Sequence, residues 1–170
     1  MKINSLAILK ATSKLMLAGA VLLLSDGCSD KCKKITCYNG GFCNDGICSC
    51  QTGYEGDDCT MEVRAKFLGT YNVNDHCTIT GDTSYTVNIA AAADEVLEVE
   101  IANFNNDFSN SVRAVVTGNN INIPPQAPDL DGRAVSGNGV FSGSNTITWS
   151  YTITFPSGPP NSCSNSVWTK

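Results

Sequence analysis

The chain has 170 residues, with 11 Lys and Arg, 16 Asp and Glu and one His, which gives a formal net charge of −5. This length suits one ordinary domain plus a small one, and an acidic balance without a basic patch disfavours nucleic acid as a partner. Nine cysteines in so short a chain indicate a disulfide framework in an oxidising compartment, or metal sites in a cytosol.

The first 27 residues have the layout of a secretion signal. Three lysines, Lys2, Lys10 and Lys14, precede an apolar run from Leu15 to Leu24, and a charged region before a short hydrophobic core is typical of exported proteins. The core has about half of the residues that a helix needs to span a bilayer, which argues against an uncleaved anchor. We therefore predict a signal peptide over residues 1–27 and, because no second apolar stretch follows, a mature chain without a transmembrane helix.

The apolar run ends in Ser25-Asp26-Gly27-Cys28, a small residue directly before a cysteine. This motif resembles a bacterial lipobox, at which a lipoprotein signal peptidase cuts and lipid is attached to the cysteine. Asp26 departs from the small uncharged residue that is usual there, although lipoboxes of Bacteroidota-type bacteria are looser. The resemblance implies a lipidated Cys28 and a short tether over residues 28–31. The alternative is an ordinary cut near Gly27 that leaves a free thiol, a liability in an oxidising space.

Removal of the signal takes three lysines and one aspartate from the totals of 11 and 16, which leaves 8 basic and 15 acidic residues and a net charge of −7. We therefore expect membrane attachment to come from acyl chains on Cys28, each buried methylene contributing roughly 0.8 kcal/mol, and not from a basic patch. The expected location is the outer membrane or the cell surface.

Residues 32–59 hold six cysteines, spaced Cys32-x4-Cys37-x5-Cys43-x4-Cys48-x-Cys50-x8-Cys59. Six cysteines alone allow fifteen pairings. The spacing, with Asn39-Gly40-Gly41-Phe42 between the cysteines and Gly53-Tyr54 in the tail, resembles the epidermal-growth-factor-like (EGF-like) family over the whole segment. The resemblance implies the disulfides Cys32–Cys43, Cys37–Cys48 and Cys50–Cys59. A segment this short cannot bury enough apolar surface to fold without cross-links.

Other chemistry for these cysteines has less support. Zinc knuckles and redox motifs need Cys-x2-Cys pairs, and none occurs. The acidic or amide pair that binds calcium in some EGF-like modules is missing, because Ser29-Asp30-Lys31 offers one carboxylate beside a lysine. We therefore predict no metal site, and we interpret Asp57-Asp58 as a solvated turn. With one cysteine assigned to lipid and six to the module, Cys77 and Cys163 are left to pair with each other.

A junction at residues 60–63 precedes a second domain at residues 64–170. Residues 67–169 alternate between apolar and polar side chains, which predicts half-buried antiparallel strands. The clearest run places Ile147, Trp149, Tyr151, Ile153 and Phe155 on one face. Turn residues separate the strands, and Ala90–Ala93 is interpreted as a hairpin loop with a turn of helix. The expected strands cover residues 67–73, 85–89, 97–101, 112–117, 119–123, 135–141, 147–155 and 163–169.

About eight short strands in roughly a hundred residues predict a β-sandwich or an up-and-down β-barrel. A Cys77–Cys163 bridge would join the first and last parts of the sheet, which favours a closed barrel. The opening Phe67-Leu68-Gly69-Thr70-Tyr71 is similar to the Gly-x-Trp/Tyr entry of calycin-like (lipocalin-like) barrels. That resemblance implies room for an interior cavity and carries no ligand residues to this chain.

No catalytic constellation emerges from the sequence. His76 is the only histidine and lies beside Cys77, which is assigned to a disulfide. Paired carboxylates for sugar cleavage would have to come from Asp94, Glu95, Glu98 and Glu100, which are more simply the solvated face of one strand pair. Gly137-Asn138-Gly139 is a flexible turn rather than a phosphate loop, because no helix follows it.

Two classes of function fit these observations. The first is a non-catalytic surface lipoprotein that binds or adheres through an EGF-like module and a barrel head, with a protein or a glycan as partner. The second is a carrier of a small apolar ligand inside the barrel. A hydrolase of surface glycans is a distant third. Trp149, Tyr151 and Phe155 discriminate between the first two, because they leave no carrier cavity if they fill the interior.

Overall fold

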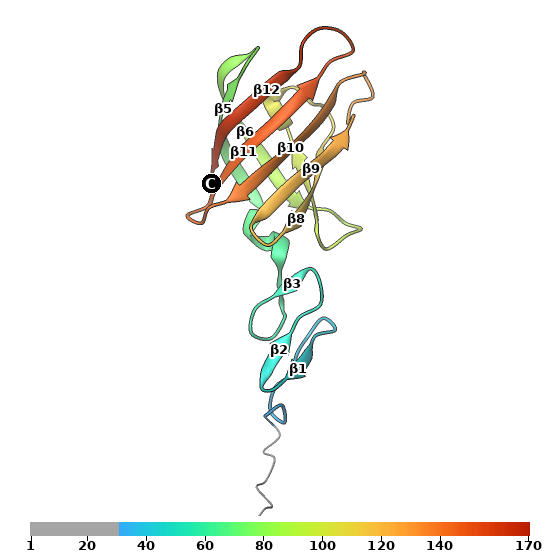
Figure 1. Ribbon diagram of the computed structural model, residues 1–170, viewed down its shortest axis with the longest axis vertical. Helices are drawn as coiled ribbons and strands as arrows, with labels where there is room; N and C mark the ends of the chain where they lie inside the picture. The colour runs from blue at the N-terminus through green and yellow to red at the C-terminus, as the bar shows by residue number, and fades with distance from the viewer. Residues whose placement is uncertain (1–30) are drawn as a thin grey trace, which may run out of the picture.

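The structure is a computed structural model that describes residues 31–170. The predicted signal peptide and the predicted lipidation residue, Cys28, lie outside the described residues. A small disulfide-linked module forms one end of an elongated molecule, and a β-barrel forms the other (Figure 1). No helix among residues 31–170 has the length and apolar character needed to cross a membrane.

The small module contains two short antiparallel ribbons, β1–β2 and β3–β4. Its disulfides join Cys32 to Cys43, Cys37 to Cys48 and Cys50 to Cys59, the three pairs expected above. Cross-links replace an apolar core here, since Cys59 is the one fully buried apolar residue among residues 31–62. The strands are β1 (Phe42–Asn44), β2 (Ile47–Ser49), β3 (Tyr54–Glu55) and β4 (Met61–Glu62).

Eight antiparallel strands close into a barrel in which each strand pairs with the next along the chain and the last pairs with the first. This confirms the predicted mainly β fold and decides between the two architectures in favour of the barrel. The strands are β5 (Gly69–Cys77), β6 (Gly81–Ala91), β7 (Glu98–Ala102), β8 (Val112–Thr117), β9 (Asn120–Gln126), β10 (Ala134–Phe141), β11 (Thr146–Thr154) and β12 (Asn161–Thr169).

The period-two pattern decides which side chains point inward. In β11 the residues Ile147, Trp149, Tyr151 and Ile153 are buried, while the threonines and the serine between them face outward. Three local expectations were wrong. Gly137-Asn138-Gly139 lies within β10 and is paired on both sides, so it is not a turn. The first strand begins at Gly69 and not at residue 67, because Val63–Phe67 forms a 3-10 helix, η1. Ala90 and Ala91 extend β6 instead of starting a helical turn.

The up-and-down topology gives the barrel two ends, which we call proximal (facing the small module) and distal. The loops at residues 92–97, 118–119 and 142–145 are proximal, and those at 78–80, 103–111, 127–133 and 155–160 are distal. Cys77 faces Cys163 across the seam between β5 and β12, near the distal end, and the two form the fourth disulfide.

Aromatic side chains fill the barrel interior. Trp149 and Trp168 lie 4.9 Å apart between ring centroids, and Phe104 stands 4.8 Å from Tyr151 and 5.7 Å from Trp168. All four are buried. Phe104 belongs to the short 3-10 helix η2 (Phe104–Asn106) in a distal loop. That loop therefore folds into the barrel and plugs its distal end.

A charged clip holds the distal plug in place. The Arg133 guanidinium contacts the carboxylates of Asp107, Asp129 and Asp131 and stacks over the ring of Phe108 at 4.9 Å. The backbone N–H groups of residues 109 and 110 donate to Asp129 and hold the pKa of that carboxyl below its ordinary value. The two distal loops are thus tied to each other across the mouth of the barrel.

A buried arginine joins the module to the barrel. Arg64, in η1, donates from Nη1 to the backbone oxygens of Ala92 (2.8 Å), Glu95 (2.8 Å) and Glu98 (2.9 Å). Its Nε also donates to Glu62 at 2.8 Å. The guanidinium satisfies three carbonyl groups, two in the proximal loop at residues 92–97 and one at the start of β7, which are remote in sequence, so the module is fixed to the barrel by more than a peptide linker.

Candidate binding surface on the outer wall of the barrel

Half of the barrel wall carries no charged residue. Strands β9 to β12 contain no Asp, Glu, Lys or Arg. The other four strands carry Asp75, Asp82, Glu98, Glu100 and Arg113. Because inward positions are apolar, the outer face of β9 to β12 consists mainly of Ser, Thr and Asn side chains.

A shallow hollow of about 480 Å³ lies on this neutral face, and we call it the wall groove. It crosses all four strands (Figure 1 shows them side by side). Its lining offers hydroxyl and amide groups and no ionised side chain. The lining residues are Asn122, Ile123, Pro125, Ser136, Gly137, Asn138, Ser150, Tyr151, Thr152, Ser162, Cys163 and Ser164.

Breaks in strand register shape the groove. The β9–β10 pairing shifts between Val135 and Gly137, and the β11–β12 pairing shifts between Trp149 and Tyr151. Such bulges bend a strand and increase its local twist. Gly137, in β10, borders the first shift and is paired with Tyr151, which borders the second. A Cβ on Gly137 would lie 2.4 Å from Cβ of Tyr151, so the close approach of β10 and β11 requires glycine.

Part of the polar lining is already paired and part is free. Asn122 donates from Nδ2 to Oδ1 of Asn138 at 2.7 Å, and the hydroxyls of Thr152 and Ser162 lie 3.3 Å apart. Within residues 31–170, the hydroxyls of three further groove residues make no side-chain hydrogen bond; they belong to Ser136, Ser150 and Ser164. The groove therefore offers donors and acceptors in fixed rows, held by the register of the sheet.

The barrel interior contains one carboxylate, that of Asp75, which is fully buried. The Tyr85 hydroxyl donates to its Oδ2 at 2.5 Å, the Tyr151 hydroxyl donates to the same oxygen, and Trp168 Nε1 donates to Oδ1 at 3.5 Å. Burial, reinforced by the negative charge of Asp75, raises the pKa values of Tyr85 and Tyr151 well above their ordinary range. This polar cluster specifies the packing of the distal half of the interior.

Sequence reasoning missed this cluster, although one signal was present. Asp75 continues the inward series of Tyr71 and Val73 at period two, which placed a carboxylate in the core. Its donors come from β6, β11 and β12, and no spacing in the sequence indicates that these three side chains meet.

A hollow of about 270 Å³ lies next to the cluster at the distal end of the barrel. It is lined by Thr80, Thr83, Ser84, Tyr85, Asn105 and Asn106.

The sequence-derived catalytic candidates do not converge on one site. His76 is exposed and pairs with Asp82 at 2.8 Å, while its neighbour Cys77 is in a disulfide. Three of the four candidate carboxylates surround Arg113 on the outer surface, at 3.2 to 3.4 Å; they are Asp94, Glu98 and Glu100. Within residues 31–170, no group of three or more His, Cys, Asp or Glu has the arrangement of a metal site.

Comparison with known protein families gives no match: no family model fits the sequence. The EGF-like and calycin-like resemblances therefore stay predictions.

Proposed function

We propose that this protein is a lipid-anchored, non-catalytic binding protein of the cell surface, in which the EGF-like module is a rigid spacer and the barrel is the binding head. The packed interior supports this proposal over a carrier of an apolar ligand. Trp149 and Tyr151 are buried in the interior and Phe155 packs at its edge, so a ligand would have to bind outside the barrel.

The wall groove is the proposed ligand site, and its neutrality carries the assignment of ligand class. Hydroxyl and amide side chains both donate and accept hydrogen bonds, which matches the many hydroxyls of a sugar. A charged ligand would find no ion pair there and would be repelled, if anionic, by the net charge of the chain. An apolar ligand would cover hydroxyls without pairing them, which costs free energy. We therefore propose a neutral glycan as the ligand.

A glycan array tests this assignment. The secreted chain, displayed multivalently to compensate for the low affinity expected of a shallow groove, should bind neutral oligosaccharides and not sialylated or sulfated ones. Ser150→Arg places a long charged side chain in the groove and should weaken that binding at least tenfold, which corresponds to about 1.4 kcal/mol.

Thr148→Arg is the matched control, because Thr148 lies on the same strand and faces outward but does not line the groove. Equal loss of binding in both variants would assign the effect to added charge and contradict a site in the groove. If the chain binds proteins but none of the glycans on the array, the proposal of a neutral glycan as the ligand is wrong.

The anchor is tested separately at Cys28. Radiolabelled palmitate should enter the wild-type protein in a bacterial host that processes lipoproteins, and the Cys28→Ala variant should stay unlabelled and leave the membrane fraction. Equal labelling of both proteins would contradict lipidation at this residue without bearing on the groove.

A further inference from the structure

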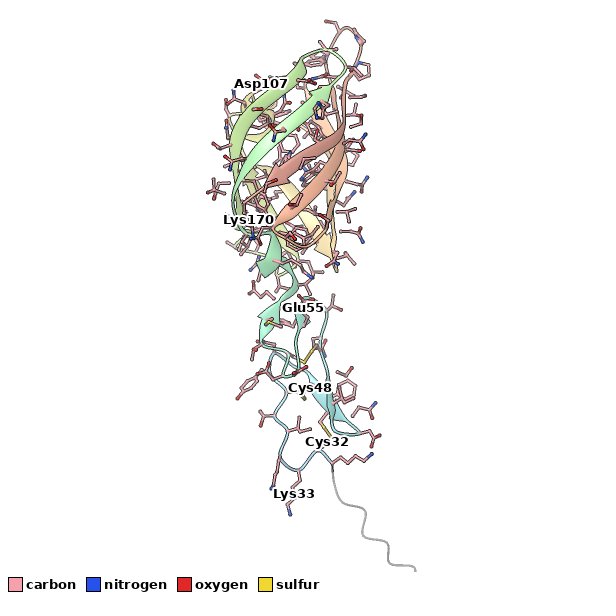
Figure 2. All side chains as sticks on the ribbon, turned by 90° about the vertical axis from the view of Figure 1, so that its left-hand side faces the viewer. Cys32, Lys33, Cys48, Glu55, Asp107 and Lys170 are labelled. Atoms are coloured by element: carbon pink, nitrogen blue, oxygen red, sulfur yellow. A yellow bond between two sulfur atoms is a disulfide. The ribbon has the colours of Figure 1, made fainter. Side chains whose placement is uncertain are left out.

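Charged residues are distributed unevenly along the molecule, although its net charge is negative. Residues 30–34 contain three lysines and one acidic residue, Asp30, whereas residues 35–170 contain 5 basic and 14 acidic residues, a net charge of −9. Figure 2 shows Lys33 at the tip of the module, the end of the described molecule opposite to Asp107, and Lys31 and Lys34 are close to it in sequence. Charges at opposite ends of the molecule are screened from one another at physiological salt. Asp30, next in sequence to Lys31, and Asp45, which pairs with Lys31, offset two of the three lysine charges, so the tip keeps an excess of one positive charge.

The lysines at the tip are open to solvent. Lys31 forms an exposed ion pair with Asp45, at 2.7 Å, and this contact places the β1–β2 hairpin turn at the tip. Lys33 and Lys34 are exposed and have no acidic partner within residues 31–170. The basic residues of η1 and the barrel other than Lys170 are engaged by carboxylates, so these two lysines are the main unpaired positive charges of the described chain.

The β1–β2 hairpin, whose turn residue Asp45 contacts Lys31, also carries two exposed apolar side chains. Cys43 and Cys48 are opposite each other in the register of the hairpin and point to one face, where each is bonded to another cysteine, so Phe42 and Ile47 lie on the opposite face. Their side chains are 61% and 73% exposed, in a module with almost no apolar core. A basic rim beside exposed aromatic and aliphatic side chains is the composition of surfaces that lie in the headgroup region of a bilayer.

The distance to the anchor decides which partner is within reach. Cys28 precedes Lys31 by three residues, and three residues span at most about 11 Å when fully extended. A lipid on Cys28 would therefore hold the lysines within the layer of headgroups and their counterions. This step rests on the lipidation proposed above.

The geometry points to a membrane seat: Lys31, Lys33 and Lys34, with Phe42 and Ile47, contact anionic headgroups of the bilayer that holds the anchor. The acyl chains provide the attachment, and the seat sets the orientation. The acidic barrel is repelled by the same surface that attracts the tip, so the long axis stands away from the membrane and the wall groove is presented to the outside.

Vesicle binding by the unlipidated chain tests the seat without the anchor. Residues 28–170 with Cys28→Ser should co-sediment with vesicles of phosphatidylcholine and phosphatidylglycerol at millimolar lipid, and not with phosphatidylcholine alone. Binding should weaken as salt is raised. Because each lysine near an anionic surface contributes about fivefold to binding, Lys33→Gln with Lys34→Gln should lower the partition coefficient roughly 30-fold. Ile47→Ser should lower it about tenfold.

Two matched controls lie at the distal end. Ser157→Asp with Pro159→Asp makes the same change in net charge at two exposed positions of the distal loop at residues 155–160. Ile79→Ser removes another isoleucine, which is 52% exposed. Both controls should bind vesicles like the parent. Binding that survives the lysine changes, or no binding to either vesicle, would overturn the seat. Palmitate labelling of Cys28 would persist in that case, so failure of the seat and failure of the anchor are distinguishable.

Discussion

At the scale of single residues, the most consequential feature is a carboxylate inside a barrel without a cation beside it. Asp75 is acceptable there because three donors, from Tyr85, Tyr151 and Trp168, surround its two oxygens. The arrangement makes two tyrosine protons part of the core. A third tyrosine, Tyr71, is also buried, near the start of β5, and its hydroxyl donates to the carbonyl of Phe67 at 2.9 Å.

We predict that the protein loses stability at alkaline pH through these tyrosines. The pKa values of Tyr71, Tyr85 and Tyr151 are raised in the folded state, chiefly by burial. Above the ordinary tyrosine pKa of about 10, the unfolded chain therefore binds fewer protons than the folded one, and the free energy of unfolding must fall as pH rises. Below that pH the contribution of these groups is constant.

Urea denaturation between pH 7 and 11.5 measures this dependence, and absorbance at 295 nm counts the tyrosines that ionise. Three of the five tyrosines should ionise only as the barrel unfolds. Ionisation of all five in a chain that remains folded would show that the hydroxyls are accessible and that the cluster is not buried.

At the scale of elements, two strands and a 3-10 helix illustrate what the sequence discloses. The alternation in β11 was sufficient to predict which of its side chains point inward, because period two is a property of the strand alone. The start of β5 was misjudged because Phe67 fits the same alternation, and only the geometry of η1, which carries Arg64 to its carbonyl partners, excludes it from the strand. Local pattern predicts elements, whereas their ends depend on tertiary contacts.

The candidate groove was predictable only in part. The outward serines and threonines of β10 and β11 were visible as the polar face of two strands. The hollow depends on the bulge beside Gly137. From the sequence, Gly137 was interpreted as part of a flexible Gly-Asn-Gly turn, so the bulge was not predicted. A register shift arises between two strands, so one strand's sequence carries little sign of it.

The joint formed by η1 gives a prediction at this scale. Arg64→Ala should destabilise the protein by about 3 kcal/mol, because three carbonyl groups lose a charged donor in a site from which water is largely excluded. Chemical denaturation measures the free energy, and small-angle scattering should show a broader range of angles between module and barrel.

Arg113→Ala is the control for this prediction. Arg113 also contacts three partners, but these are exposed carboxylates on the outer surface, and such ion pairs contribute at most about 1 kcal/mol. Similar losses in the two variants would mean that Arg64 is no more important than a surface ion pair.

At the scale of the whole molecule, the Cys77–Cys163 bridge closes a loop with a sequence separation of 86. In the chain-entropy model such a loop contributes about 4.5 kcal/mol, a large share of the 5–15 kcal/mol typical of a domain. Cys77→Ser with Cys163→Ser should therefore lower the melting temperature of the barrel by about 20 °C, as calorimetry would show.

The disulfides of the small module should be unaffected in that double variant, which peptide mapping under non-reducing conditions verifies. The companion variant, Cys50→Ser with Cys59→Ser, should loosen the module and leave the barrel transition in place. A barrel that melts at the wild-type temperature without its bridge would show that strand pairing and packing alone close it.

The position of that bridge also determines how the protein carries mechanical load. Tension between the N-terminal side of the barrel and its C-terminus enters through β5 and leaves through β12, and a covalent link joins these two strands at Cys77 and Cys163. The force passes across the bridge, so the chain between the two cysteines is shielded from extension. That shielded segment includes β9, β10 and β11, which form most of the wall groove. Under such tension the β9 to β11 part of the proposed binding surface would stay folded while the parts of β5 and β12 outside the bridge are extended.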